Sequence, residues 1–77
     1  MTISEFVQWH QKEHGCSPAF LPPTITGPAH APAVEVELQY YGLACGEFSV
    51  IGKGANQKIA RQNAVDTACQ EMFGDES

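Results

Sequence analysis

The sequence predicts an α+β domain of order α-β-β-β-α, with two helices packed on one face of a three-stranded antiparallel sheet. Apolar residues recur at helical spacing near both ends of the chain, residues 33–41 alternate between apolar and polar side chains, and all five prolines fall within residues 16–32. The 77 residues suffice for one small domain. Two helices with apolar stripes and a sheet with one apolar face bury these surfaces most simply as two layers.

Residues 2–14 predict the first helix. Thr2 is suited to be the N-cap, and Glu5, three residues later, completes a capping box. Gly15 ends the helix. One flank, mostly apolar, carries Ile3, Phe6, Trp9, His10 and Glu13, and the polar side carries Ser4, Glu5, Gln8, Gln11 and Lys12. We expect His10 to pack against the core, because it shares the apolar flank.

Three extended segments follow. Residues 20–26 predict an edge strand, because their prolines cannot donate hydrogen bonds to a central ladder. Residues 33–41 predict a strand with Val34, Val36, Leu38 and Tyr40 on one face and Glu35, Glu37 and Gln39 on the other. After a turn at residues 41–43, residues 44–51 predict the second strand of a hairpin, with Phe48 and Val50 facing inward.

The last element predicted is a helix over residues 56–73. Asn56 is a good N-cap, and Gly74 is a natural stop. The buried stripe consists of Ala60, Ala64, Ala68 and Met72, flanked by Val65, Cys69 and Phe73. Small alanines on a helix stripe allow close approach to a sheet. The domain is therefore expected over residues 1–74, with residues 75–77 as an acidic tail or the start of a linker.

Composition narrows the class of protein. No apolar run approaches the roughly 20 residues that span a bilayer, and no secretory signal is recognisable. Cys16, Cys45 and Cys69 are odd in number and show no C-x-x-C spacing, so we expect reduced thiols rather than disulfides or a zinc site. We therefore expect an intracellular protein, cytoplasmic or nuclear, with no membrane partner.

The charge is distributed unevenly. The chain carries a formal net charge of −5, yet three of its four cations, Lys53, Lys58 and Arg61, fall within nine residues. Residues 52–61 contain no Asp or Glu and lead from a glycine turn into a helix start. Because helix N-termini offer free N–H groups and a positive dipole end, this layout favours phosphate binding over a merely solvated cationic face.

With these features the chain resembles a double-stranded RNA-binding domain over nearly its full length. Residues 3–12 are similar to the opening helix of that family, and Gly27-Pro28-Ala29-His30 is similar to its Gly-Pro-x-His loop. Residues 52–64 are similar to its glycine turn followed by Lys-Lys-x-Ala-Lys and alanines. The chain departs from the pattern at Gln8, Ala33, Val34, Asn56 and Gln57, where the family usually has other residues.

The resemblance implies a set of RNA contacts. An A-form duplex presents minor groove, major-groove phosphates and minor groove along one face of about 16 base pairs. The residues implied for the phosphates are Lys53, Gln57, Lys58 and Arg61, and those implied for the minor groove are Ser4, Glu5, Gln8, Pro28 and His30. For the His30 ring, a hydrogen bond that stabilises its own loop is an equal alternative. For Ser4 and Gln8, each taken singly, an ordinary polar helix face is at least as strong an alternative.

The expected function is therefore a non-catalytic module that binds double-stranded RNA weakly, with little sequence preference, within a larger RNA-processing, editing or silencing protein. No nucleophile–base pair, paired carboxylates or phosphate loop is present, and we expect no cofactor, metal or small-molecule substrate. The alternative is a protein-interaction or dimerisation module of the same fold with weak or lost RNA binding. An accessory domain of an endonuclease polypeptide is a remote third possibility.

Overall fold

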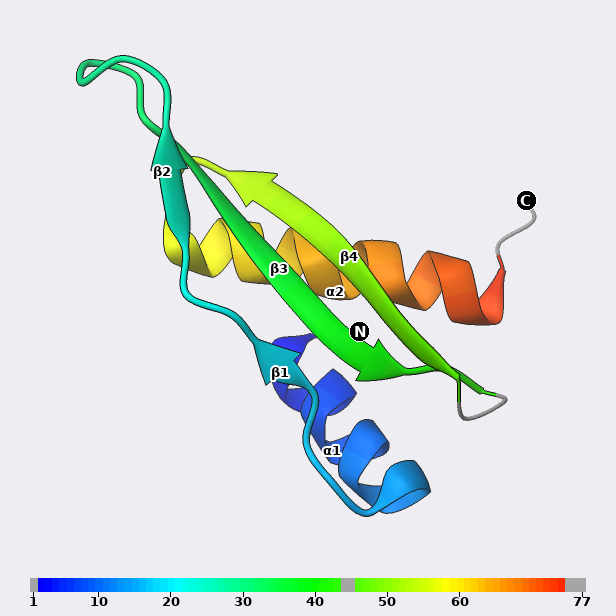
Figure 1. The fold of residues 1–77 in the computed structure, drawn as a ribbon. Helices are drawn as coiled ribbons and strands as arrows, with labels where there is room; N and C mark the ends of the chain where they lie inside the picture. Colours follow the sequence, from blue (N-terminus) through cyan, green and yellow to red (C-terminus); the bar gives the residue numbers. More distant parts are fainter. Residues whose placement is uncertain (1, 44–45, 75–77) are drawn as a thin grey trace.

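The chain folds into two layers, one of helices and one of sheet (Figure 1). The structure is a computed structural model and describes residues 2–43 and 46–74. Its elements are, in order, α1 (Ile3–His14), β1 (Ala19–Phe20), β2 (Thr24–Thr26), β3 (Ala33–Tyr41), β4 (Glu47–Gly54) and α2 (Gln57–Phe73). All strand pairs are antiparallel, and both helices pack on the same face of the sheet. The predicted α+β architecture is confirmed.

Strand β3 is the centre of the sheet. Strand β4 pairs with it from Tyr41↔Glu47 to Val34↔Gly54. Strands β1 and β2 also pair with β3, opposite residues 38–39 and 33–35 respectively. The predicted single edge strand over residues 20–26 is thus two short strands. Pro22 and Pro23 lie in the gap, where a residue without an N–H cannot continue the ladder.

The predicted alternation along β3 is confirmed. Its four inward residues, Val34, Val36, Leu38 and Tyr40, are buried. Strand β4 begins later than predicted and continues to Gly54, while residues 44 and 45 of the predicted strand lie outside the described residues. Phe48 does face inward, since it pairs with Tyr40 and the two rings stack 5.9 Å apart. At the hairpin end of the sheet, however, Phe48 remains 53% exposed.

Both helices begin at the predicted caps. The Thr2 hydroxyl accepts from the Glu5 amide at 3.1 Å, and the Glu5 carboxylate accepts from the Thr2 amide at 2.9 Å. Gly15 ends α1 with a φ of 75°, in the left-handed region that glycine adopts without strain. The Asn56 side chain accepts from the amide of Ile59 at 2.9 Å and caps α2.

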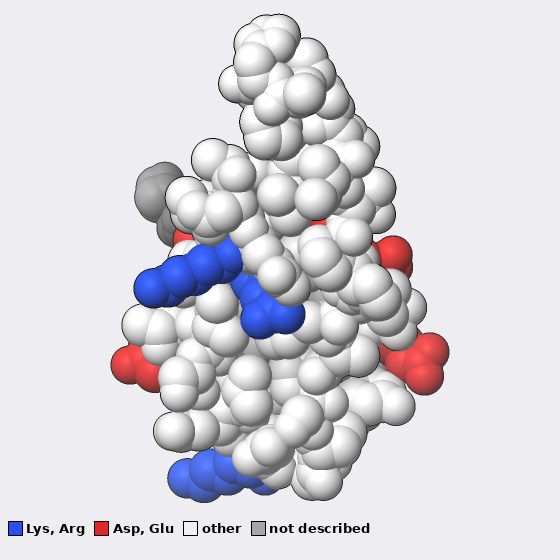
Figure 2. Space-filling model, turned by 90° about the vertical axis from the view of Figure 1, so that its left-hand side faces the viewer, with Lys and Arg blue, Asp and Glu red and all other residues white. Residues whose placement is uncertain are grey.

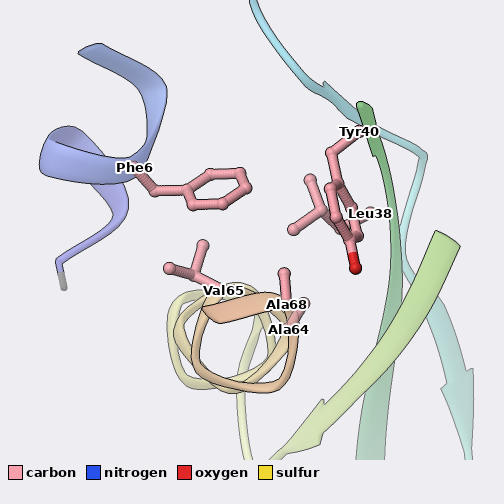
Figure 3. Close-up of a cluster of buried hydrophobic side chains, with 6 residues drawn as sticks. All are labelled: Phe6, Leu38, Tyr40, Ala64, Val65 and Ala68. Atoms are coloured by element: carbon pink, nitrogen blue, oxygen red, sulfur yellow. The ribbon is translucent and has the colours of Figure 1, made fainter. Parts of the chain in front are cut away.

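The core lies between the helices and the inner face of the sheet (Figure 3). Phe6 reaches from α1 toward Leu38 and Tyr40 of β3, and α2 contributes Val65 and its alanine stripe. The three alanines of that stripe, Ala60, Ala64 and Ala68, are fully buried. A Cβ at Gly52 of β4 would collide with the backbone of α2, so the glycine permits the close approach that the alanines predict.

His10 packs in the core as predicted and also joins three segments of the chain. Its ring is fully buried. The Tyr41 amide donates to Nε2 at 3.0 Å, so Nδ1 carries the proton and donates to the carbonyl of Cys16 at 2.6 Å. The position of α1 on the sheet is therefore fixed by a polar contact as well as by apolar packing.

Candidate nucleic-acid interface

The three segments predicted to contact RNA lie along one side of the molecule (Figure 1). The loop between β2 and β3 forms one end, α1 forms the other, and the N-terminus of α2 lies between them. The largest dimension of the molecule is 41 Å. The order of the segments along this side is the one that successive minor, major and minor grooves require.

The central part of this side carries Lys58 and Arg61 of α2. Lys58 is exposed, Arg61 is half-buried, and the first turn of α2 has no acidic residue. Within residues 2–43 and 46–74, neither cation forms an ion pair with a carboxylate. Figure 2 shows this side, with cationic groups near its middle and toward its lower end and acidic groups at its margins.

Lys53 does not join Lys58 and Arg61, contrary to the expectation of a single cationic group. It lies in β4 between Gly52 and Gly54, whose missing Cβ atoms would both point at α2. Because side chains alternate along a strand, Lys53 points to the opposite, outer face. There its Nζ lies 3.8 Å from the Glu35 carboxylate, and its side chain is 71% exposed.

Gln57 is the first residue of α2 and is exposed. It therefore lies beside Lys58 at the helix end, where backbone N–H groups lack partners within the helix. The Asn56 cap uses the amide of Ile59, and the amides before it remain available to an anion.

Helix α1 presents its predicted residues at the second end of this side. Ser4, Glu5 and Gln8 are all exposed. The Glu5 carboxylate is engaged by the Thr2 amide in the capping box, so it is less free to contact a 2′-hydroxyl. Ser4 and Gln8 are one turn apart, and neither side chain makes a hydrogen bond within the described part of the chain.

The loop after β2 presents Pro28 and His30, both exposed. The amide of Ala31 donates to the carbonyl of Pro28 at 3.0 Å and closes a tight turn between them. The His30 ring forms no hydrogen bond to the rest of the described chain, so the alternative of a ring that stabilises its own loop is not what the structure shows.

Two residues that shape this candidate interface were not predicted from the sequence. Asn63 of α2 donates from its side chain to the carbonyl of Lys53 and so ties the helix to β4. Phe20 of β1 lies beneath Arg61, with the guanidinium carbon 5.8 Å from the ring centroid. Nothing in the sequence alone relates residue 20 to residue 61, because the strand and helix that carry them meet only in the fold.

Shifted pKa values occur away from this side, in the core. Burial raises the pKa of the Tyr40 phenol, and the nearby Glu71 carboxylate raises it further. Burial also raises the pKa of the Cys69 thiol. Cys16 and Cys69 form no disulfide within the described residues, and Cys45 lies outside them.

No model of a known protein family matches the chain, and no curated protein matches it. Among the described residues, no helix is long and apolar enough to cross a bilayer.

Proposed function

We propose that the chain is a non-catalytic module that binds double-stranded RNA by shape, as a divergent member of the double-stranded RNA-binding domain family. The observation that carries the proposal is the pair of cations at the start of α2. Lys58 and Arg61 have no carboxylate partner in the described structure, and they lie between two exposed polar segments, the His30 loop and α1.

The proposed RNA contacts are of two chemical kinds, ionic contacts to phosphates and hydrogen bonds to 2′-hydroxyls. Lys58 would meet a phosphate as a point charge, and Arg61 would meet one with a forked pair of N–H donors. The free amides at the start of α2 would add donors to the same anionic edge of the major groove. Ser4 and Gln8 on one side and the His30 loop on the other would face the 2′-hydroxyls of successive minor grooves.

Binding is expected to be weak and sensitive to salt. Lys53 faces away from this side, Gln57 carries no charge, and the chain as a whole carries −5. Two cations release few counterions, so both the affinity and its salt dependence are smaller than for a strongly basic domain. Such a module would tether a larger RNA-processing or silencing protein, in the cytoplasm or nucleus, to its substrate.

The test is a titration of an RNA duplex of roughly 20 base pairs, beside DNA of matching sequence, at about 50 and 200 mM salt. The Lys58→Ala, Arg61→Ala double variant should lose at least about tenfold in RNA affinity and about 2 in the slope of log affinity against log salt. Lys53→Ala is the matched control and should bind like the unmodified chain. Equal binding by the folded double variant and the unmodified chain would refute the proposal.

A second candidate is a protein-interaction or dimerisation module of the same fold. The observation that favours it is the exposure of apolar residues: Ile51 on the uncovered face of the sheet is 56% exposed, and Ile59 on α2 is 43% exposed. This candidate predicts self-association or partner binding that Ile51→Thr or Ile59→Gln weakens and that the Lys58 and Arg61 changes leave intact. Sedimentation of the chain over a range of concentrations distinguishes the two candidates.

A further inference from the structure

We infer that Phe20 is a positioning residue for RNA binding, because its ring holds the Arg61 guanidinium in the orientation that meets a phosphate. The inference rests on the proposed function and assigns a role to a residue outside the predicted set of RNA contacts. It starts from the 5.8 Å separation between the Arg61 guanidinium carbon and the Phe20 ring centroid, which lies within the range of a cation–π contact.

The burial of its nitrogen atoms shows which edge of the Arg61 guanidinium faces the protein. Its Nε is buried and has no hydrogen-bond partner, whereas the two terminal nitrogens are not among the buried, unpartnered atoms of the described residues. Within residues 2–43 and 46–74, no acceptor bonds to those terminal nitrogens. The guanidinium therefore turns its Nε edge into the protein, and its two Nη groups are not fully buried. The fork of these two groups is the part of arginine that matches two oxygens of one phosphate.

Phe20 is itself fixed in place, so it can act as a platform. It pairs with Leu38 in the β1–β3 ladder, and the next amide, that of Leu21, donates to the carbonyl of Glu37 at 2.9 Å. Its ring is half-buried and packs against both clusters of the hydrophobic core. A ring held by the sheet and by the core cannot follow a moving side chain, so it restricts the rotamers available to the arginine above it.

The two cations of the interface therefore differ in how much rotamer freedom they lose on binding. Lys58 is exposed, and no aromatic ring of the described residues lies against it. It must give up rotamer freedom when a phosphate arrives. Arg61 has given up much of that freedom already, because the fold holds it against Phe20. Preorganisation of this kind raises affinity without adding a contact to the ligand.

The experiment is a double-mutant cycle between Phe20→Leu and Arg61→Ala, read as affinity for an RNA duplex of roughly 20 base pairs. Leucine keeps the apolar packing of Phe20 and removes the ring. Phe20→Leu should weaken binding about threefold to tenfold when Arg61 is present and have no effect when residue 61 is alanine. Phe20→Tyr keeps a ring face and should bind within about twofold of the unmodified chain.

A control separates positioning from a general loss of stability. Val50→Ala also trims a partly buried residue that packs against the core, on β4, and leaves the Arg61–Phe20 pair in place. Urea unfolding of each variant shows how far Phe20→Leu and Val50→Ala lower stability, and only Phe20→Leu should lower RNA affinity. Equal weakening by Phe20→Leu in both Arg61 backgrounds, or by Val50→Ala, would overturn the positioning role alone. An unmodified chain that binds no duplex would overturn the proposed function, and this inference with it.

Discussion

The start of α2 and the outer face of the sheet are built from adjacent stretches of chain but have opposite electrostatic character. At the start of α2, Lys58 and Arg61 have no carboxylate partner within the described residues. Only five residues before Lys58, Lys53 lies on the outer face of the sheet beside the Glu35 carboxylate. That face also carries Glu37 and Glu47, the cross-strand partners of Ile51 and Tyr41.

The difference shows that cations close in sequence need not be close in space. The chain passes from β4 to α2 between Lys53 and Lys58, and a strand alternates its side chains between two faces whereas a helix distributes them around its axis. One lysine is therefore placed with the sheet carboxylates and the other with Arg61. In the proposed function, a duplex would be attracted by one side of the molecule and repelled by the other, so the charges would orient it as well as bind it.

The largest effect on stability is expected at Gly52 of β4, where the strand lies directly against α2. The cationic start of α2 and the outer face of the sheet lie on either side of this contact. Valine there would place its Cβ in the backbone of Ala60 and Ala64. Gly52→Val should lower the free energy of unfolding by about 3 kcal/mol or more, because the helix cannot move away without opening the core. Urea unfolding measures this. Ile51→Thr, on the outer face of the same strand, should change it by less than about 0.5 kcal/mol. A Gly52→Val chain as stable as the parent would show that β4 and α2 are not closely packed at this residue.

Charge reversal tests the contrast between the surfaces directly. Lys58→Glu with Arg61→Glu should reduce duplex RNA affinity on the order of 100-fold, because two charge-assisted contacts are replaced by repulsion. Lys53→Glu makes a reversal on the outer face and should reduce affinity by less than about threefold, through long-range repulsion alone. The readout is a titration at about 50 mM salt, repeated at about 200 mM. Similar losses for the two reversals would mean that the surfaces are not functionally distinct.

The smallest effect is expected from adding a cation at the start of α2. Gln57→Lys places a lysine beside Lys58, at the exposed first residue of the helix. RNA affinity should rise about threefold at low salt, and the slope of log affinity against log salt should steepen by about 1. Glu35→Gln, which removes a carboxylate from the outer face, is the comparison and should leave the slope unchanged. If both variants steepened it equally, net charge rather than position would govern binding.

Much of the fold was predictable because local rules decide it. Thr2 and Asn56 cap helices by bonding amides three residues ahead, which needs no other part of the chain. The alternation along β3 follows from one buried face of a sheet. The division of the edge strand was not predicted, although its cause, Pro22 and Pro23, was visible in the sequence. A proline is compatible with an edge strand, but two consecutive prolines also interrupt the strand, as between β1 and β2.

The candidate site was predictable only in part. The sequence placed Lys58 and Arg61 together, since residues three apart on a helix are neighbours. It did not separate Lys53 from them, because the strand was predicted to end at residue 51. Pairing with β3 extends β4 to Gly54, so Lys53 belongs to the strand and lies on its outer face. The sequence could not find Phe20 either, since the contact of that ring with Arg61 joins residues 41 positions apart.

By itself, the sequence determined where both helices and the central strand form, which residues cap the helices and which stripe of α2 is small enough to approach a sheet. These properties follow from hydrogen bonds and side-chain sizes within a few residues. Only the tertiary structure decided which cations share a surface, which carboxylate meets Lys53 and which ring supports Arg61. Those outcomes depend on strand register and on the packing of α2 against β4 and β1, which bring distant residues together.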